Sequence, residues 1–302
     1  MQIPKAEIHF VTKEGFESLL SFNRYIYKVH VLRESGLSLL IKDLKKENFD
    51  LVIDLHNNMR SHIIGMFLWK RLVRFNKLNF AKWLIVALKI NILPQKHLVD
   101  RYFEQLKDYN INNDQKGLDY FINPEVPLPY ELKQLTYCVL SIGGQHKTKR
   151  LPSNKIVELV NSLKISIVIV GGSADAEDAN RIMKETEHNH VINFCGKASL
   201  HESARIIESS SFVITHDTGM MHIAAALKKR IVSIWGNTIP EFGMYPYFGS
   251  SMENYDQSRI FEVNGLSCRP CSKIGFEKCP KGHFDCMNLQ DVYTIASYCN
   301  GL

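Results

Sequence analysis

The sequence lacks a hydrophobic run long enough to cross a membrane. A bilayer-spanning helix needs about 20 mostly apolar residues, and the nearest candidate, Trp83 to Leu88, lies between Lys82 and Lys89. Such a segment is typical of a buried or interfacial helix. The first residues, 1–5, do not resemble a signal peptide, because no apolar core follows a basic lead. We therefore expect a cytoplasmic protein.

The sequence also lacks a strong charge of one sign. Its net charge is +6 over 302 residues, and it has no basic patches interleaved with aromatics, which argues against nucleic acid. The small excess of positive charge favours anionic ligands or an anionic membrane surface. Charges spread over solvated faces would give the same net charge. The apolar share of 45% indicates a globular protein, and the length allows two domains.

The C-terminal half alternates apolar runs with amphipathic segments. A capping-box pattern from Ser199 to Glu202 predicts the start of one helix. The β-α order with short connections predicts an open parallel sheet covered by helices on both faces. The predicted strands are Tyr137–Ile142, Ile165–Val170, Val191–Phe194, Ser211–Thr215 and Ile231–Trp235.

The N-terminal half repeats this pattern less regularly. Proline-rich residues 124–129 predict a linker, and we expect two Rossmann-like domains, 1–128 and 129–302, facing each other across a cleft. The predicted strands here are Glu7–Val11, Lys28–Leu32 and Phe49–Leu55, and the predicted helices are Ser38–Lys46, Arg60–Lys70, Ala81–Ile90 and His97–Lys107.

The loop after Ser211–Thr215 is the strongest candidate ligand site, because ligands bind beyond the carboxyl ends of parallel strands. It reads His216-Asp217-Thr218-Gly219 and opens a helix that carries His222. A helix start offers free N–H groups and a positive dipole end to phosphate, and His222 shares the face of Thr218 and Gly219. A plain N-cap beside a packed histidine is the alternative interpretation.

Three further loops follow predicted strands. Residues 143–152 combine two glycines with Lys149 and Arg150, which suit a diphosphate, although the order is not that of a Walker loop. Residues 171–175 end in Asp175, which suits ribose hydroxyls or a helix N-cap. Residues 54–62 gather polar and basic groups that suit an acidic acceptor or acid/base chemistry, or else a capped helix start.

These residues resemble glycosyltransferase family 9, the bacterial ADP-heptose:lipopolysaccharide heptosyltransferases. The similarity covers nearly the whole chain, and its most specific element is Asp217-Thr218-Gly219-x-x-His222. The other matching motifs are Asp54-Leu55-His56 through Arg60-Ser61, Lys149-Arg150-Leu151-Pro152, Ala224–Leu227, Trp235-Gly236-Asn237-Thr238 with Pro240, and Tyr245-Pro246.

The resemblance implies an α/β GT-B fold with the nucleotide sugar on residues 129–302 and the acceptor on residues 1–128. It implies inverting transfer of a heptose or related sugar from an ADP-sugar to the lipopolysaccharide inner core, without a catalytic cofactor and with peripheral contact to the inner membrane face. By position, the implied donor-binding residues are Lys149, Asp175, Glu177, Asp217, Thr218, Gly219 and His222, and the implied acceptor-binding residues are His56, Arg60 and Ser61.

One departure from the family concerns catalysis. Family members open with a strand and a Gly-Asp loop, which carries the proposed catalytic Asp, before the equivalent of residues 6–11. This sequence begins later, so we expect an incomplete N-terminal domain with Asp54 or His56 as substitute base. The alternative function is a non-catalytic or weakly active nucleotide-sugar-binding remnant. A nucleotide-sugar epimerase is disfavoured, because its carboxylate set is not recognisable.

Four of the seven cysteines fall in one short segment, as Cys268-x2-Cys271-x7-Cys279-x6-Cys286. Disulfides are rare in the cytosol, so this spacing raises the question of metal: it can supply a structural zinc with four thiolates, or with three and His283. Reduced or occasionally bridged thiols are the alternative. The family resemblance implies no metal in the mechanism.

Overall fold

The computed structural model describes residues 2–34, 36–249 and 257–302. The chain forms two compact units: unit 1 comprises Met1–Asn79 and Lys96–Asp114, and unit 2 comprises Phe80–Gln95 and Gln115–Leu302. The domain boundary after residue 128 stays a prediction. Each unit is described below by itself.

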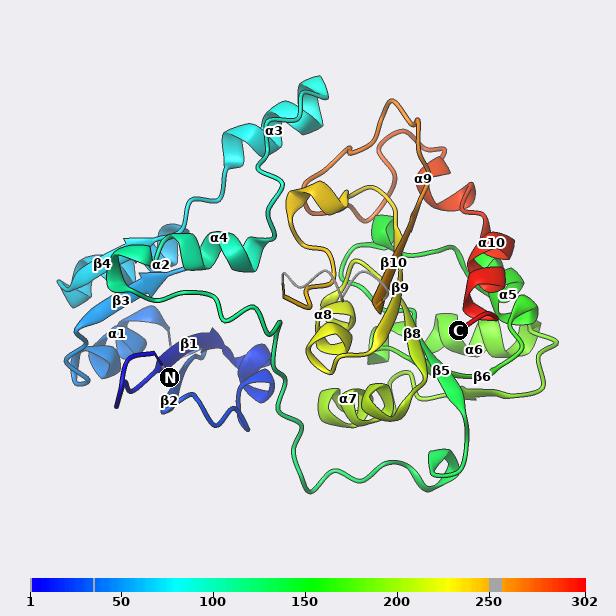
Figure 1. The fold of residues 1–302 in the computed structure, drawn as a ribbon, viewed down its shortest axis with the longest axis horizontal. Helices are drawn as coiled ribbons and strands as arrows, with labels where there is room; N and C mark the ends of the chain where they lie inside the picture. The colour runs from blue at the N-terminus through cyan, green and yellow to red at the C-terminus, as the bar shows by residue number, and fades with distance from the viewer. Residues whose placement is uncertain (1, 35, 250–256) are drawn as a thin grey trace. The chain divides into compact units, whose positions relative to one another are not determined.

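Unit 2 contains a six-stranded parallel sheet in the order β10-β9-β8-β5-β6-β7 (Figure 1). This confirms the predicted parallel sheet and adds one strand, β10, to it. The strands are β5 (Tyr137–Ser141), β6 (Ser166–Val170), β7 (Val191–Asn193), β8 (Phe212–His216), β9 (Arg230–Trp235) and β10 (Ser258–Glu262).

Helices cover both faces of this sheet, so its central strands are buried on both sides. Every residue of β5 and β8 is buried, which explains why the sequence shows continuous apolar runs there instead of alternation. Figure 1 shows α7 and α8 on one side of the sheet and α5, α6 and α10 on the other. The helices are α5 (Ser153–Ser162), α6 (Ala176–Glu185), α7 (Leu200–Ser209), α8 (Gly219–Ala226), α9 (Asp285–Asn288) and α10 (Val292–Cys299).

The predicted capping box is present at the start of α7. The Ser199 hydroxyl accepts a hydrogen bond from the Glu202 amide, and the Glu202 carboxylate accepts one from the Ser199 amide. Two otherwise unpaired N–H groups are therefore satisfied reciprocally. The capping box fixes where α7 begins.

Unit 1 has two small parallel pairs, β1 (His9–Lys13) with β2 (Lys28–Leu32) and β3 (Leu51–Asp54) with β4 (Arg71–Arg74). The sequence did not predict β4, because it is only four residues long, places two apolar residues between two arginines, and directly follows a helical pattern. Leu40, Leu44 and Leu68 form a small core. The helices are α1 (Leu37–Lys45), α2 (Met59–Leu68) and α4 (Leu98–Glu104).

Helix α3 (Asn79–Leu88) is the apolar segment noted in the sequence. From Phe80 onward it belongs to unit 2, where it buries Ala81 and Ile85 and where Ile85 packs against Ile239 and Phe242. Among the residues that the structure describes, no helix combines the length and apolar character that a membrane span requires.

Candidate donor site

Four loops of unit 2 follow the carboxyl ends of neighbouring strands. The loops after β5 and β6 carry the glycines Gly143, Gly144 and Gly171, and those after β8 and β9 carry Asp217 and Thr238. Because these strands are parallel and adjacent in the order β9-β8-β5-β6, their loops share one edge of the sheet. This is the edge at which open α/β sheets bind ligands.

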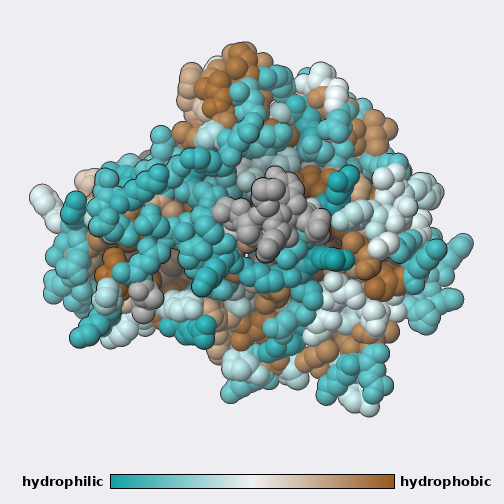
Figure 2. All heavy atoms as spheres, viewed as in Figure 1, coloured by the Kyte–Doolittle hydropathy of each residue, from teal (hydrophilic) through white to brown (hydrophobic). Residues whose placement is uncertain are grey.

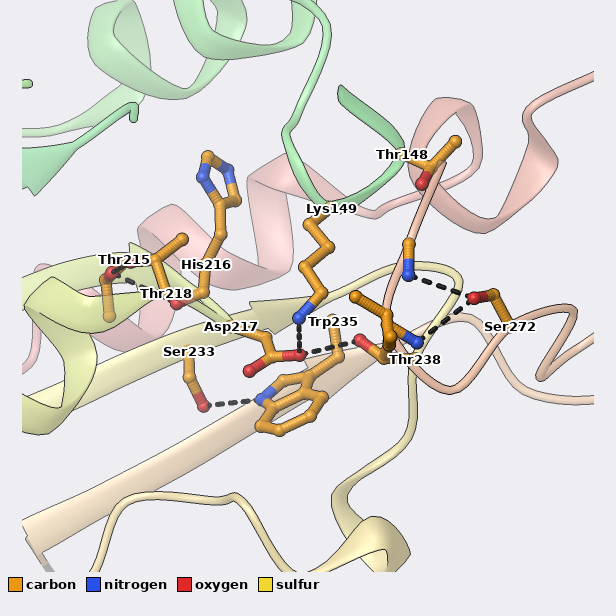
Figure 3. A network of polar contacts seen from close by, with 12 residues as sticks. Thr148, Lys149, Thr215, His216, Asp217, Thr218, Ser233, Trp235, Thr238 and Ser272 are labelled. Carbon is orange, nitrogen blue, oxygen red and sulfur yellow. Dashed lines mark hydrogen bonds and ion pairs between the residues drawn. The ribbon is translucent and has the colours of Figure 1, made fainter. Parts of the chain in front are cut away.

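An ion pair joins two of these loops, and a third loop adds a hydrogen bond. Lys149 Nζ donates to Asp217 Oδ2 at 2.6 Å, and Thr238 Oγ1 donates to the same oxygen at 2.8 Å (Figure 3). The side chain of Asp217 is 7% exposed and that of Lys149 is 16% exposed. The two charges are therefore shielded from water and interact more strongly than a surface pair would.

Helix α8 begins directly after this ion pair. Thr218 is its N-cap residue, but the Thr218 side chain makes no capping hydrogen bond; its hydroxyl lies 3.4 Å from the Thr215 hydroxyl (Figure 3). Gly219 is exposed, and open space surrounds the position that a side chain would take there. The N–H groups of the first turn and the positive end of the helix dipole are therefore accessible to an anion.

Arg150 ties the loop after β5 to the loop after β6. Its guanidinium donates to Asp175 Oδ1 at 2.7 Å and to the Gly144 carbonyl. The second Asp175 oxygen accepts from the Gly172 amide at 2.8 Å, and Asp175 is buried. Asp175 is thus engaged within the protein, whereas Glu177 is exposed in the first turn of α6. Of the two carboxylates, Glu177 is the more accessible one.

Two histidines lie beside the ion pair, and burial lowers the pKa of both. The buried His216 ring accepts a hydrogen bond at Nε2 from the Leu151 amide. Burial, with a smaller contribution from the Arg150 charge, lowers the pKa of His216 to about 4. Burial also lowers the pKa of His222, and the nearby Asp217 opposes this shift. A neutral imidazole at His222 can still donate one hydrogen bond to a phosphate or a sugar hydroxyl.

The segment 263–284, which has no helix or strand, contacts the loops after β5 and β9 and holds them in place. Arg269 donates from Nε to the Gly236 carbonyl at 2.6 Å and from Nη2 to the Thr238 carbonyl at 2.9 Å. The Thr148 hydroxyl exchanges hydrogen bonds with the backbone of Phe276 at 3.0 and 2.8 Å. The sequence analysis missed Arg269, because no motif connects it with loops more than 30 residues away.

The polar loop of unit 1 is organised around Asp54. Asp54 Oδ1 accepts from the amides of His56 and Asn57 at 3.0 and 2.7 Å, and Oδ2 accepts from the Ser61 hydroxyl at 2.8 Å. Both carboxylate oxygens are therefore engaged in fixing the loop. His56 and Arg60 are exposed, so they are more accessible than Asp54 or Ser61 to an acceptor.

The four predicted zinc ligands line one cavity. Cys268, Cys271, Cys279 and Cys286, together with His283, surround a cavity of about 10 Å³, enough for one water-sized group. Asn237 also lines it, and its buried side-chain amide has no hydrogen-bond partner among the described residues. No three of these cysteine and histidine ligand atoms, however, lie mutually within 4.8 Å in the described part of the chain.

Comparison with known proteins gives the family. The model of glycosyltransferase family 9 (heptosyltransferase) matches residues 38–273. The chain belongs to this family. Lipooligosaccharide heptosyltransferase 2 of Haemophilus influenzae is 28% identical over 224 residues, which are 65% of this chain and 63% of the relative. Lipopolysaccharide heptosyltransferase 1 of Escherichia coli is 25% identical over 260 residues, which are 79% and 81% of the two chains.

Solved structures of the family share the fold. A glycosyltransferase family 9 structure from Veillonella parvula matches with a TM-score of 0.75 at 18% identity, and the match covers 99% of this chain and 88% of the Veillonella chain. ADP-heptose lipopolysaccharide heptosyltransferase II of E. coli matches with a TM-score of 0.66 at 16% identity, and the match covers 98% of this chain and 92% of the E. coli chain. These similarities confirm the predicted α/β GT-B fold class.

The buried His216 predicts a loss of stability in acid. Its pKa is lowered in the folded state, so the unfolded state binds more protons as the pH falls below about 6.5. The stabilisation is complete above that value and is lost as the pH falls toward 4. Between pH 7 and pH 5, urea denaturation should show that the free energy of unfolding falls by an amount on the order of 2 kcal/mol because of this group. His216→Gln should lack this contribution to the pH dependence. Equal pH dependence in both proteins would contradict this account.

Proposed function

We propose that this protein is a glycosyltransferase that moves a heptose or related sugar from an ADP-sugar to a lipopolysaccharide core acceptor, with inversion at the sugar carbon. The observation that carries this proposal is the Lys149–Asp217–Thr238 cluster beside the open start of α8. Family membership supports the reaction class. Solved structures of the E. coli heptosyltransferase WaaC hold ADP and ADP-2-deoxy-2-fluoro heptose, which supports the donor.

In the proposed reaction the acceptor oxygen attacks the sugar carbon while the bond to the diphosphate breaks. Negative charge then grows on the departing diphosphate, and stabilising that charge lowers the barrier. Lys149 supplies a positive charge, and the first turn of α8 supplies N–H groups and a dipole end. The diphosphate takes over part of the Lys149 interaction from Asp217, whose oxygens can then accept hydrogen bonds from sugar hydroxyls. No metal is needed for this step.

The acceptor hydroxyl also needs a base. Asp54 is engaged by two amides and the Ser61 hydroxyl, whereas His56 is exposed on the same loop. We therefore propose His56 as the base and Asp54 as the residue that positions it. The alternative, a nucleotide-sugar-binding remnant, binds ADP equally well but does not transfer the sugar.

Donor binding is tested by Lys149→Met, which removes the charge and keeps most of the side-chain length. We expect ADP affinity, measured by calorimetry, to fall about tenfold or more, because a charge-assisted hydrogen bond is lost. Lys147→Met is the matched control, since Lys147 belongs to the same short 3-10 turn (Lys147–Lys149) but is exposed. An affinity that falls equally in both variants, or in neither, would exclude a donor-site role for Lys149.

The choice of base is tested by comparing His56→Asn with Asp54→Asn. With ADP-heptose and a lipopolysaccharide core acceptor, we expect kcat to fall by roughly 100-fold or more for His56→Asn, since general-base catalysis is lost. Asp54→Asn keeps an oxygen that accepts the two loop amides, so its kcat should fall by less than about tenfold. The reverse order would make Asp54 the base. ADP binding without any transfer by the unaltered chain would favour the remnant.

We further propose that the cysteine cluster holds a structural zinc. The four thiols line one cavity of ion size, and zinc would hold their sulfurs at the usual Zn–S distance of about 2.3 Å. The metal would fasten segment 263–284, through which Arg269 and Phe276 hold the donor loops.

Elemental analysis after dialysis tests this metal. Cys268→Ser with Cys271→Ser should reduce the zinc content by about one ion per chain. Cys299→Ala, which removes a buried cysteine of α10, should leave the content unchanged. An unchanged zinc content in the double variant would rule out a thiolate site.

A peripheral contact with the cytoplasmic face of the inner membrane is proposed for α3. Phe80 is 70%, Trp83 54% and Leu88 55% exposed on this helix, and Figure 2 shows apolar atoms gathered over it at the top of the view. Exposed aromatic and aliphatic side chains of this kind suit the headgroup boundary of a bilayer. Lys89 anchors the end of α3 by donating to the carbonyls of Cys268 and Pro270.

Sedimentation with anionic lipid vesicles tests this contact. Phe80→Ser with Trp83→Ser should reduce the bound fraction several-fold, because most of the exposed aromatic surface of α3 is removed. Tyr293→Ser, which alters an aromatic residue of α10 that is 66% exposed, is the control and should bind like the unaltered chain. Equal binding by all three proteins would exclude α3 as the contact.

A further inference from the structure

Two imidazoles and a carboxylate meet in unit 1, in a cluster that does not include the polar loop after β3. His9 lies at the start of β1, His30 in the middle of β2, and Glu47 between α1 and β3. His30 is buried, His9 is partly buried, and the Glu47 side chain is 20% exposed. None of the three belongs to a motif that the family resemblance or the donor chemistry uses.

The potential ligand atoms converge on one point. His9 Nδ1 lies 3.0 Å from His30 Nε2, and His30 Nε2 lies 3.9 Å from Glu47 Oε1. All three ligand atoms lie within 4.8 Å of one another, and this is the one such group of three among residues 2–34, 36–249 and 257–302. A tetrahedral zinc site separates its ligand atoms by about 3.3 Å, a value between the two distances observed here.

Aromatic packing limits the freedom of both imidazoles. The Phe49 ring meets His9 edge-on at a centroid distance of 5.1 Å and an interplanar angle of 82°, and it meets His30 at 6.4 Å and 79°. The two imidazoles are nearly parallel, with an interplanar angle of 18°. Rings held in this way have little rotamer entropy left to lose when they bind an ion.

We propose that His9, His30 and Glu47 bind a divalent transition-metal ion, with zinc as the best match. Two imidazole nitrogens and one carboxylate oxygen are ligands that zinc shares with nickel, cobalt and copper, whereas magnesium and calcium take oxygen ligands. Three protein ligands leave the fourth tetrahedral position to water. This site is independent of the proposed transfer reaction and of the cysteine cluster.

Lys28 is the competitor for the carboxylate. Its Nζ lies 2.5 Å from Glu47 Oε1, the oxygen that faces His30. The Lys28 side chain is 51% exposed, so its ammonium can turn to water with little loss, because an exposed ion pair contributes little stability. Glu47 also has a second oxygen, which can keep the Lys28 contact while the first binds the ion.

The ion would act as a clamp within unit 1. It would join β1, β2 and the segment that leads from α1 to β3, which are separated by 17 or more residues along the chain. Unit 1 has few buried apolar side chains in its described part: Leu40, Ile41, Leu44, Leu68 and Phe75. A small core gains most from a metal, because the binding energy of the ion adds to the stability of the fold.

Zinc titration of the full chain tests the proposal. The chain is first stripped with a chelator and carries Cys268→Ser and Cys271→Ser, so that thiolate binding does not interfere. Calorimetry should then detect one zinc ion per chain, and His9→Gln in the same background should raise its Kd by about tenfold or more. His190→Gln, at an exposed histidine of unit 2, should leave the Kd unchanged. Absence of saturable binding, or an equal Kd in the His9 variant, would overturn the proposal.

Cobalt absorption provides a second measurement that needs no cysteine substitution. Cobalt bound by imidazole and carboxylate shows visible d–d bands without the near-ultraviolet charge-transfer band of thiolate. Glu47→Gln in the otherwise unaltered chain should lower the visible d–d absorption by the contribution of this site and leave the thiolate charge-transfer band unchanged. Loss of the thiolate band alone, or no spectral change, would show that the histidine pair is merely hydrogen-bonded.

Discussion

The ion pair between Lys149 and Asp217 is the interaction on which the candidate site depends. It joins the loop after β5 to the end of β8, and Thr238 adds the loop after β9 through the same carboxylate oxygen. Because both charges are largely buried, removing either partner would leave the other without compensation. Arg150 and Arg269 add further polar contacts at this edge of the sheet, and their hydrogen bonds to loop carbonyls hold the backbone of these loops in place.

This arrangement suits a ligand that carries its own negative charge. A preformed pair keeps the lysine in a fixed position before the ligand arrives, so little reorganisation accompanies binding. The adjacent start of α8 has no side-chain cap, which leaves its N–H groups for the ligand. Burial lowers the pKa of both His216 and His222, which disfavours a competing positive charge on either ring.

The sequence predicted the parts of this protein that depend on local pattern. The buried runs of β5 and β8, the capping box of α7 and the start of α8 after β8 follow from hydrophobic continuity and helix-start chemistry. The edge strands were harder: β4 is a four-residue strand with two arginines, and β10 follows a long segment without periodicity. The tertiary partners of single side chains also lay beyond sequence reasoning. The contacts of Asp175 with Arg150 and the Gly172 amide follow from no sequence pattern, and Arg269 reaches loops that no spacing rule connects to it.

A double-mutant cycle on ADP affinity tests the central claim most directly. Calorimetry would compare the unaltered chain with Lys149→Met, Asp217→Asn and the double variant. If the pair organises the donor site as one unit, the double variant should lose far less affinity than the sum of the two single losses. Strictly additive losses, or single variants that bind ADP like the unaltered chain, would contradict the account.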